Sequence, residues 1–239
     1  MGGISGAFIL LPFQMSILGY TAPSVSATNQ LFNIVATPSG VWRYLREDRM
    51  LWHLTWVVSA GSLPGVFVGA WLRLEFLPDP QSFKFFAGLV LLFLGGKIFF
   101  EVINSGQGSS PTPTLKFDHL ENTFVISNAR FSLKTVDYEF NDQSFSFSVP
   151  VVFLLCLGVG IVGGIYGIGG GAIIAPFLVT IFSLPVYTVA GAALMGTFVT
   201  SVAGVLSYQL LSPIYSSMLV APDWYLGAAM GVGGFYGIY

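Results

Sequence analysis

A glycine-rich segment, Gly163–Pro176, could bind an anion through its backbone. It lies inside an apolar run from Val149 to Leu184. As one straight helix that run would be roughly 54 Å long, against a hydrocarbon core of about 30 Å. Because glycine and proline both disfavour a continuous helix, we expect a break between Gly167 and Pro176. A helix that restarts inside the membrane directs its first N–H groups at the break, and such groups attract anions.

Uncharged polar side chains on the neighbouring segments could complete such a site. For each of them two interpretations stay open, a substrate contact or a hydrogen bond between helices. Asn33 and Thr197 each lie one helix after a glycine segment, where a site would need donors. No arginine is expected at the middle of the membrane, so selectivity would depend on dipoles and hydrogen bonds. The candidates are Ser5, Gln14, Asn29, Gln30, Asn33, Thr37, Tyr166, Thr197, Thr200 and Ser201.

Composition places the chain among membrane proteins that cross the bilayer several times. Hydrophobic residues make up 54% of the chain and charged residues 8%, with a mean hydropathy of +0.77. So few lysines and arginines leave no basic patch for nucleic acid. No grouping of histidine, cysteine or carboxylate predicts catalysis, a metal site or a cofactor. We therefore expect a multi-pass protein of the cell membrane that contacts the lipid bilayer and is not an enzyme.

The apolar segments predict an all-α polytopic membrane protein with broken glycine-rich helices. Glycines four residues apart, in Gly61-xxx-Gly65-xxx-Gly69 and Gly227-xxx-Gly231, predict close helix packing, with a substrate contact as the alternative. The expected spans are Met1–Leu18 as half a span, Ser26–Tyr44, Trp52–Leu72, Phe83–Ile103, the broken Val149–Leu184, Tyr187–Leu211 and Trp224–Tyr239.

Two parts of the chain resemble each other and predict an internal repeat. In one ungapped register Gly3 aligns with Gly167, Pro12-Phe13 with Pro176-Phe177, and Tyr44 with Tyr208; after an insertion Trp52 aligns with Trp224. Many transporters consist of two such copies, with the substrate near the midplane between broken helices. We expect the first repeat over 1–103 and the second over 149–239. Whether the copies are parallel or inverted stays open. Each copy lacks a segment that the other has, so the chain is expected to be truncated at both ends, with a naturally short relative as the alternative.

Residues 104–148 differ in character from both repeats. Asn104–Thr114 is rich in Gly, Ser, Pro and Thr and predicts a flexible linker. Leu115–Phe147 alternates apolar and polar residues, with turn signals at Ser127-Asn128 and Asn141-Asp142. We expect a small β-rich soluble insert of β-hairpins. A regulatory or docking role and a plain connector between the repeats both stay open.

The arginines predict the orientation of the chain. Arg43, Arg46 and Arg49 follow the second span, whereas the next loop carries only Arg73 and Lys84. The positive-inside rule then places the arginine cluster in the cytoplasm. If the third and fourth spans each cross once, the insert is cytoplasmic as well.

These motifs resemble the TauE/SafE family of sulfite and organosulfonate exporters. The matching pattern is a glycine-rich break that ends in proline, followed by a small-residue helix with Ser and Thr, here Gly164–Pro176 and Gly191–Ser201. The first copy offers Gly2–Pro12 and Asn29–Asn33. The resemblance covers both membrane parts but not 104–148. It implies two related multi-span halves and export of sulfur-containing anions.

The leading hypothesis is a secondary transporter, an exporter of small anions such as sulfite or an organosulfonate, bound between the two repeats. The expected partners are the anion and the lipid bilayer; no nucleic acid is expected, and a homo-oligomer is one option. The alternatives are a non-transport membrane scaffold or assembly protein, and a cation transporter that uses unwound carbonyl groups. The predicted substrate-binding residues are Ser5, Gly6, Pro12, Asn29, Asn33, Gly169, Gly170, Gly171, Pro176, Thr197, Thr200 and Ser201.

Overall fold

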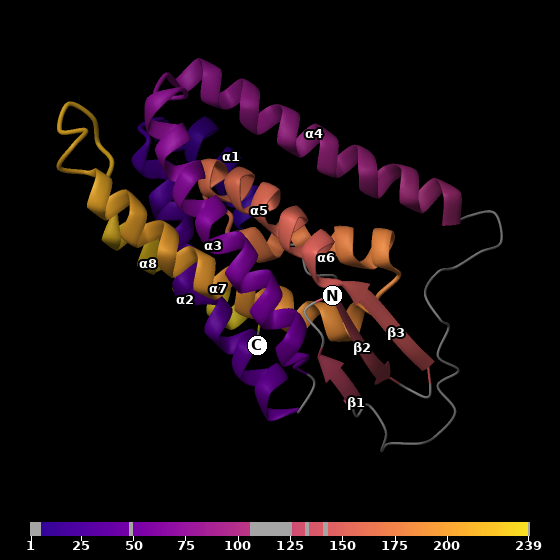
Figure 1. Ribbon diagram of the computed structural model, residues 1–239. Coiled ribbons are helices and arrows are strands. Elements are labelled where there is room, and N and C mark those ends of the chain that lie inside the picture. Colours follow the sequence, from indigo (N-terminus) through magenta and orange to yellow (C-terminus); the bar gives the residue numbers. More distant parts are fainter. Residues whose placement is uncertain (1–5, 48–49, 106–125, 132–133, 141–142, 239) are drawn as a thin grey trace.

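The computed structural model describes residues 6–47, 50–105, 126–131, 134–140 and 143–238. Within these residues the chain forms eight helices and three strands (Figure 1). The helices are α1 (Ala7–Ser16), α2 (Ser24–Arg46), α3 (Trp52–Glu75), α4 (Pro80–Ser105), α5 (Val149–Tyr166), α6 (Gly170–Phe182), α7 (Val186–Leu211) and α8 (Trp224–Ile238). The strands are β1 (Ile126–Phe131), β2 (Thr135–Phe140) and β3 (Gln143–Ser148).

The membrane part is helical, as the apolar segments predict. Every predicted span contains a helix, and the third and last spans begin at the tryptophans that also begin α3 and α8. Of the described helices, α3, α5 and α7 are long and apolar enough to cross a membrane, while α1 and α6 are short apolar helices.

The predicted break is a reversal between two helices. Gly167 and Gly169 have φ values of +87° and +82°, which side chains other than glycine rarely allow. α5 and α6 contact each other, and α5 also contacts β3. Val149 N donates to the Lys134 carbonyl, and the hydroxyls of Tyr138 and Thr188, the latter at the start of α7, are 3.2 Å apart. The chain therefore turns back at Gly167–Gly169 instead of continuing across.

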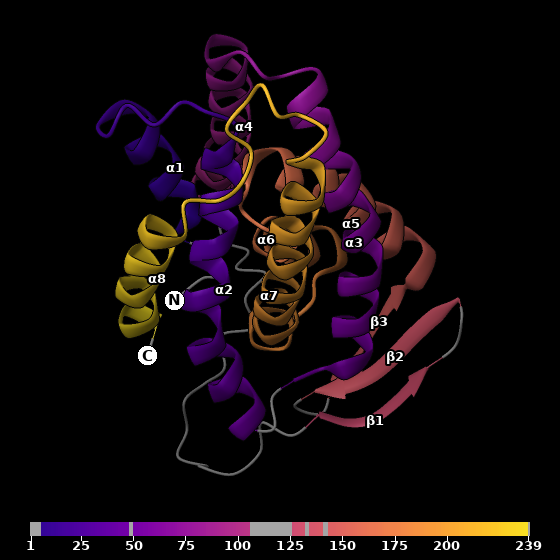
Figure 2. The ribbon, with the colours of Figure 1, turned by 90° about the vertical axis from the view of Figure 1, so that its left-hand side faces the viewer.

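Two antiparallel helices, α2 and α7, lie at the centre, with α8 beside α2 and α3 beside α7 (Figure 2). α2 begins where α7 ends, because Ser24 N donates to the Leu219 carbonyl at 2.9 Å, in the segment after α7. At the opposite end, Gly191 near the start of α7 lies against the ring of Tyr44 near the end of α2.

Glycines let α3 and α5 approach closely. A Cβ atom on Gly61 would lie 2.9 Å from the Phe153 carbonyl oxygen, and one on Gly65 would overlap the Leu157 carbonyl oxygen. From the other side, Gly160 lies against the backbone of α3 at Ser62. Gly227 and Gly231 lie likewise against Leu31 and Val35 of α2. The close packing predicted for both glycine patterns is confirmed.

The strands form an antiparallel sheet in the order β1-β2-β3, beside the beginning of α3 (Figure 2). Val136 and Tyr138 alternate with the exposed Asp137, so one face of β2 is buried. The turn predicted at Ser127-Asn128 is wrong: both residues lie within β1, where the pairing with β2 shifts between Ser127 and Arg130. A β-bulge absorbs the polar pair without ending the strand. The turn predicted at Asn141-Asp142 and most of the predicted linker lie outside the described residues.

Candidate functional site

Three carbonyl groups around the α5–α6 turn accept hydrogen bonds from side chains of α2 and α7. All three donors are fully buried. The pairs are Tyr208 Oη to the Gly164 carbonyl (2.9 Å), Ser26 Oγ to the Ile165 carbonyl (2.9 Å) and Asn33 Nδ2 to the Ile168 carbonyl (2.6 Å). These are carbonyls that the end of α5 and the turn leave without helical partners. The side chains of α2 and α7 therefore fix the turn in place.

Threonines of α7 lie against the first turn of α6. Gly170 N donates to Thr200 Oγ1 at 3.1 Å. A Cβ atom on Gly171 would lie 2.7 Å from Thr197 Oγ1, so this helix start fits closely against α7. The residue before α6 is Gly169, which supplies no side chain to cap the helix. The positive end of the α6 dipole therefore faces polar side chains of α7 and, at Gly170, Ser62 of α3.

One polar side chain of α2 and one of α7 are buried without a partner. Gln30 and Ser201 are both 0% exposed. Among the described residues, neither amide atom of Gln30 nor the Ser201 hydroxyl has a hydrogen-bond partner. Gly204 makes room for the Gln30 amide, and Ser201 Oγ lies 2.9 Å from the position of a Cβ on Gly169. Buried polar groups nearly always have partners, and each orphaned one costs about 1–3 kcal/mol. A polar ligand could satisfy them.

We call this group the polar cluster: Gln30 and Asn33 of α2, Thr200 and Ser201 of α7, and Gly169–Gly171 at the start of α6. Of the predicted site residues it unites Asn33, Gly169, Gly170, Gly171, Thr200 and Ser201, with Thr197 directly beside Gly171. The Thr197 hydroxyl itself donates within α7, to the Ala193 carbonyl at 2.8 Å.

The other predicted residues of the first copy lie to one side of the polar cluster. Asn29 Nδ2 donates to the Ala7 carbonyl at 3.1 Å and so joins α2 to α1. Gly6 precedes α1, and Pro12 lies inside it. Ser5 lies outside the described residues. Gly6, Pro12 and Asn29 therefore lie on the α1 side of the fold instead of at the α5–α6 turn.

Pro176 also lies away from the polar cluster, inside α6. Its carbonyl accepts a hydrogen bond from Lys97 Nζ of α4 at 3.2 Å, and the same ammonium lies 3.8 Å from the centre of the Phe177 ring. Pro176 therefore helps to attach α4 to α6, which is a structural role.

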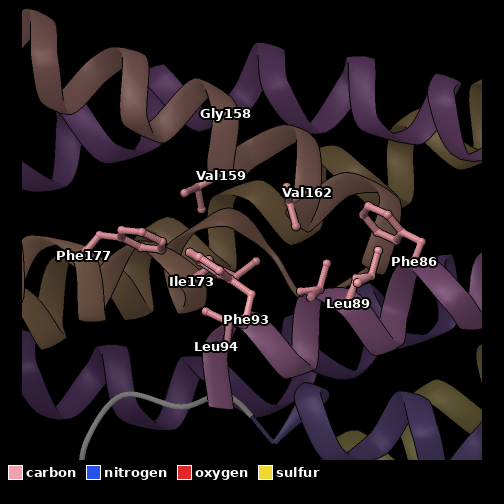
Figure 3. A pocket seen from close by; sticks show the side chains of 10 residues that line it. Phe86, Leu89, Phe93, Leu94, Gly158, Val159, Val162, Ile173 and Phe177 are labelled. Carbon is pink, nitrogen blue, oxygen red and sulfur yellow. The ribbon is translucent and has the colours of Figure 1, made fainter. Parts of the chain in front are cut away.

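An apolar cavity of about 300 Å³ lies between α4, α5 and α6 (Figure 3). Its lining offers carbon atoms almost exclusively, so it lacks the donors that an anion needs. The lining residues are Phe86, Leu89, Val90, Phe93, Leu94, Gly158, Val159, Val162, Ile173 and Phe177. We therefore place the candidate anion site in the polar cluster and not in this cavity.

Several residues were missed or misplaced by the sequence analysis. Gln30 was one polar candidate among many, and only its unpartnered burial distinguishes it. The repeat alignment paired Tyr208 with Tyr44, but it did not predict the hydrogen bond from the Tyr208 hydroxyl to the Gly164 carbonyl. Ser26 had no distinguishing signal. Arg73, expected in a loop, is fully buried in α3.

Comparison with known proteins identifies the class of the chain. The sequence profile described as "Sulfite exporter TauE/SafE" matches residues 1–239. A relative from Bacillus subtilis (strain 168), named "Probable membrane transporter protein YunE", is 22% identical over 246 residues, which cover 95% of this chain and 81% of the relative. No solved structure matches the chain. With its apolar helices, the chain is a multi-pass membrane protein of a transporter family. Because the profile covers its whole length, the chain belongs to the sulfite exporter TauE/SafE family.

Proposed function

We propose that this protein is a secondary transporter of small anions, with sulfite or an organosulfonate as the substrate and export as the direction. The observation that carries the proposal is the pair Gln30 and Ser201, buried without partners between α2 and α7, with Ser201 against Gly169 at the start of α6. Their amide and hydroxyl donors, together with the positive end of α6, suit an oxyanion. The family name supports the choice of sulfur oxyanions.

The hydrogen bonds around the turn favour an anion over a cation. A cation site at a broken helix uses unwound carbonyl groups. Here the carbonyls of Gly164, Ile165 and Ile168 already accept hydrogen bonds from side chains. Those bonds offset the negative end of α5, whereas the N-cap residue of α6, Gly169, carries no capping side chain.

Helix pairing supports a second part of the proposal, two inverted repeats over 1–103 and 149–239 with 104–148 between them. The proposed alignment makes α2 equivalent to α7 and α3 to α8, and the equivalent helices α2 and α7 run in opposite directions. α2 packs against α8, and α7 against α3. Tyr44 contacts Gly191, and its counterpart Tyr208 packs with Ala27, the counterpart of Gly191. When a two-fold axis relates the two repeats, a contact between α2 and α8 implies the equivalent contact between α7 and α3, as observed here.

Inverted repeats would give the polar cluster a route to both sides of the membrane. Gln30, Asn33, Thr200 and Ser201 are all fully buried, so this conformation is closed to solvent. Small rigid-body movements of one repeat against the other would open the polar cluster to either side in turn. A scaffold protein would gain nothing from unpartnered polar groups in that position.

Flux measurements on reconstituted protein test the proposal. We expect saturable sulfite flux in proteoliposomes that Gln30→Met lowers at least tenfold, since the substitution removes both amide atoms but retains the side-chain length. The matched control is Ser39→Ala, because Ser39 is also buried in α2 and its hydroxyl donates only to the Ala36 carbonyl of its own helix. Sodium flux without sulfite or sulfonate flux would support the cation alternative, and a folded protein that moves none of these ions would support a scaffold.

A further inference from the structure

Arg73 is a buried cation at the end of α3. It lies in the last turn of the helix and is 0% exposed, although its sequence position suggested a loop charge. Its guanidinium lies 3.8 Å from the centre of the Phe83 ring of α4, which covers it. A guanidinium stays charged at neutral pH, and a buried charge without a counter-charge is strongly unfavourable.

No carboxylate among the described residues pairs with this guanidinium. Nη1 donates to the Leu77 carbonyl, which follows α3. The one ion pair in the described part of the chain joins Arg43 to Glu47 at 3.1 Å. Glu75, two residues after Arg73, accepts a hydrogen bond from the Tyr215 hydroxyl at 2.7 Å.

Two nitrogens of the guanidinium, Nε and Nη2, are buried without an acceptor among the described residues. These two atoms share one edge of the planar group, where their N–H bonds point in parallel. That edge is the one that holds two oxygens of a carboxylate, phosphate or similar oxyanion. The unsatisfied atoms of Arg73 are therefore the two that a bidentate oxyanion would occupy.

Arg73 is connected to the polar cluster through α7. Tyr208 packs in one buried cluster with Ala70 and Leu74, which flank Arg73 in α3, and its hydroxyl donates to the Gly164 carbonyl just before the turn. Ser201 lies two turns before Tyr208 in α7, a separation of about 10 Å along a helix. An anion could pass between the two positions along one face of α7.

We propose that Arg73 forms a second anion-binding position, which holds a small oxyanion through Nε and Nη2 at the end of the α2–α7 core opposite the β-sheet. The proposal deepens the proposed function, because the anion at Arg73 would be the transported one on its way to or from the polar cluster. The chemistry required is an oxyanion, and either a free ion or the phosphate of a lipid can supply it.

The test measures binding separately from transport. Purified protein in a maltoside detergent and phosphate-free buffer is heated with and without sulfite, sulfate or phosphate. We expect at least one of these anions to raise the melting temperature of the wild-type protein by about 3 °C. Arg73→Gln should weaken that anion's half-saturation at least tenfold, and Arg73→Lys should weaken it less, because lysine retains the charge but not the two-donor edge. The matched control Arg43→Gln removes an exposed, paired arginine and should respond like the wild type.

Three outcomes separate the two proposals. Arg73-dependent stabilisation without any anion flux would retain the Arg73 position and reject anion transport. Flux with stabilisation that Arg73→Gln leaves unchanged, or with neither anion stabilisation nor a phospholipid retained through Arg73, would overturn the Arg73 position alone. Native mass spectrometry identifies the source: a phospholipid retained by wild type and Arg43→Gln but lost from Arg73→Gln would assign the oxyanion to a lipid, and its absence to a free ion.

Discussion

Two interfaces in this protein both contain glycines, yet they use them differently. Between α3 and α5, Gly65 and Gly160 let two backbones approach, and backbone atoms fill the space. Between α2 and α7, Gly204 makes room for a polar side chain, the amide of Gln30. The first interface follows the small-residue packing of membrane helices. The second retains an unsatisfied amide that packing alone would not favour. A glycine in a membrane helix therefore indicates that another group approaches the helix closely. Where backbone atoms fill the space, the glycine serves packing, and where an unsatisfied polar side chain fills it, the glycine is a candidate for function.

The largest effect is expected from a methyl group in the packed interface. Gly65→Ala would drive its Cβ into the Leu157 carbonyl oxygen, and a backbone cannot move aside as a side chain can. We expect a loss of about 3 kcal/mol, seen as a melting temperature lower by about 8 °C in detergent. Gly158→Ala is the matched control on α5, since a Cβ there meets nothing within 4 Å. Equal stability of the two variants would contradict the assignment of this interface to packing.

In the other interface the same substitution should separate stability from transport. A Cβ on Gly204 would overlap the Gln30 amide, which is the far end of a flexible side chain and can rotate away. We expect Gly204→Ala to cost about 1 kcal/mol of stability but to lower sulfite flux about tenfold, because Gln30 leaves the polar cluster. Melting temperature and flux are measured on the same preparation. A variant that loses stability as severely as Gly65→Ala would show that both interfaces serve packing alone.

The same contrast explains what the sequence could predict. Apolar runs place the helices well, because length and hydropathy alone decide whether a segment suits a bilayer. Glycine spacing predicts that one face of α3 packs closely, because the pattern lies along one helix, but it does not identify α5 as the partner. The reversal at Gly167–Gly169 depends on two positive φ angles and on donors from α2 and α7, which no local pattern encodes.

Burial of individual polar groups is equally hard to predict. Arg73 is buried because Phe83 of the next helix covers it, and a hydropathy profile places a charge at a helix end in solvent. Gln30 resembles the other polar residues of α2 until its lack of a partner is known. Both depend on contacts between helices distant in the sequence, so they required the structure.

A smaller effect is expected at the start of α6, where the polar cluster also stabilises the fold. Thr200→Val removes the hydroxyl that accepts the Gly170 N–H and retains the shape of the side chain. Loss of such a cap costs about 1 kcal/mol, so we expect a melting temperature lower by about 3 °C. Thr200→Ser should behave like the wild type in the same thermal measurement. If valine were tolerated without loss, the N–H would have another acceptor and Thr200 would not cap the helix.

The smallest effect at neutral pH is expected at the β-sheet, where Tyr138 of β2 contacts Thr188 of α7. Burial raises the pKa of Tyr138 to about 12, although its hydrogen bond with Thr188 acts in the opposite direction. An unfolded tyrosine titrates near 10, so the folded state holds the proton more tightly. This contribution is therefore complete below about pH 10 and is lost as the pH rises toward 12. Tyr138→Phe should cost about 1 kcal/mol or less at pH 8, through one hydrogen bond, and should reduce the loss of melting temperature between pH 10 and 12.

The control for that titration is Tyr225→Phe, because Tyr225 in α8 is 91% exposed and contributes nothing to the core. Its pH profile should match the wild type. A Tyr138→Phe profile that falls as steeply as that of the wild type over the same interval would assign the alkaline transition to other groups. The Tyr138 hydroxyl has a hydrogen-bond partner, Thr188, and so it only stabilises the contact between β2 and α7. Gln30 and Ser201, in the interface between α2 and α7, lack partners. A buried polar side chain is a candidate for function here when the folded protein leaves its hydrogen bonds unmade.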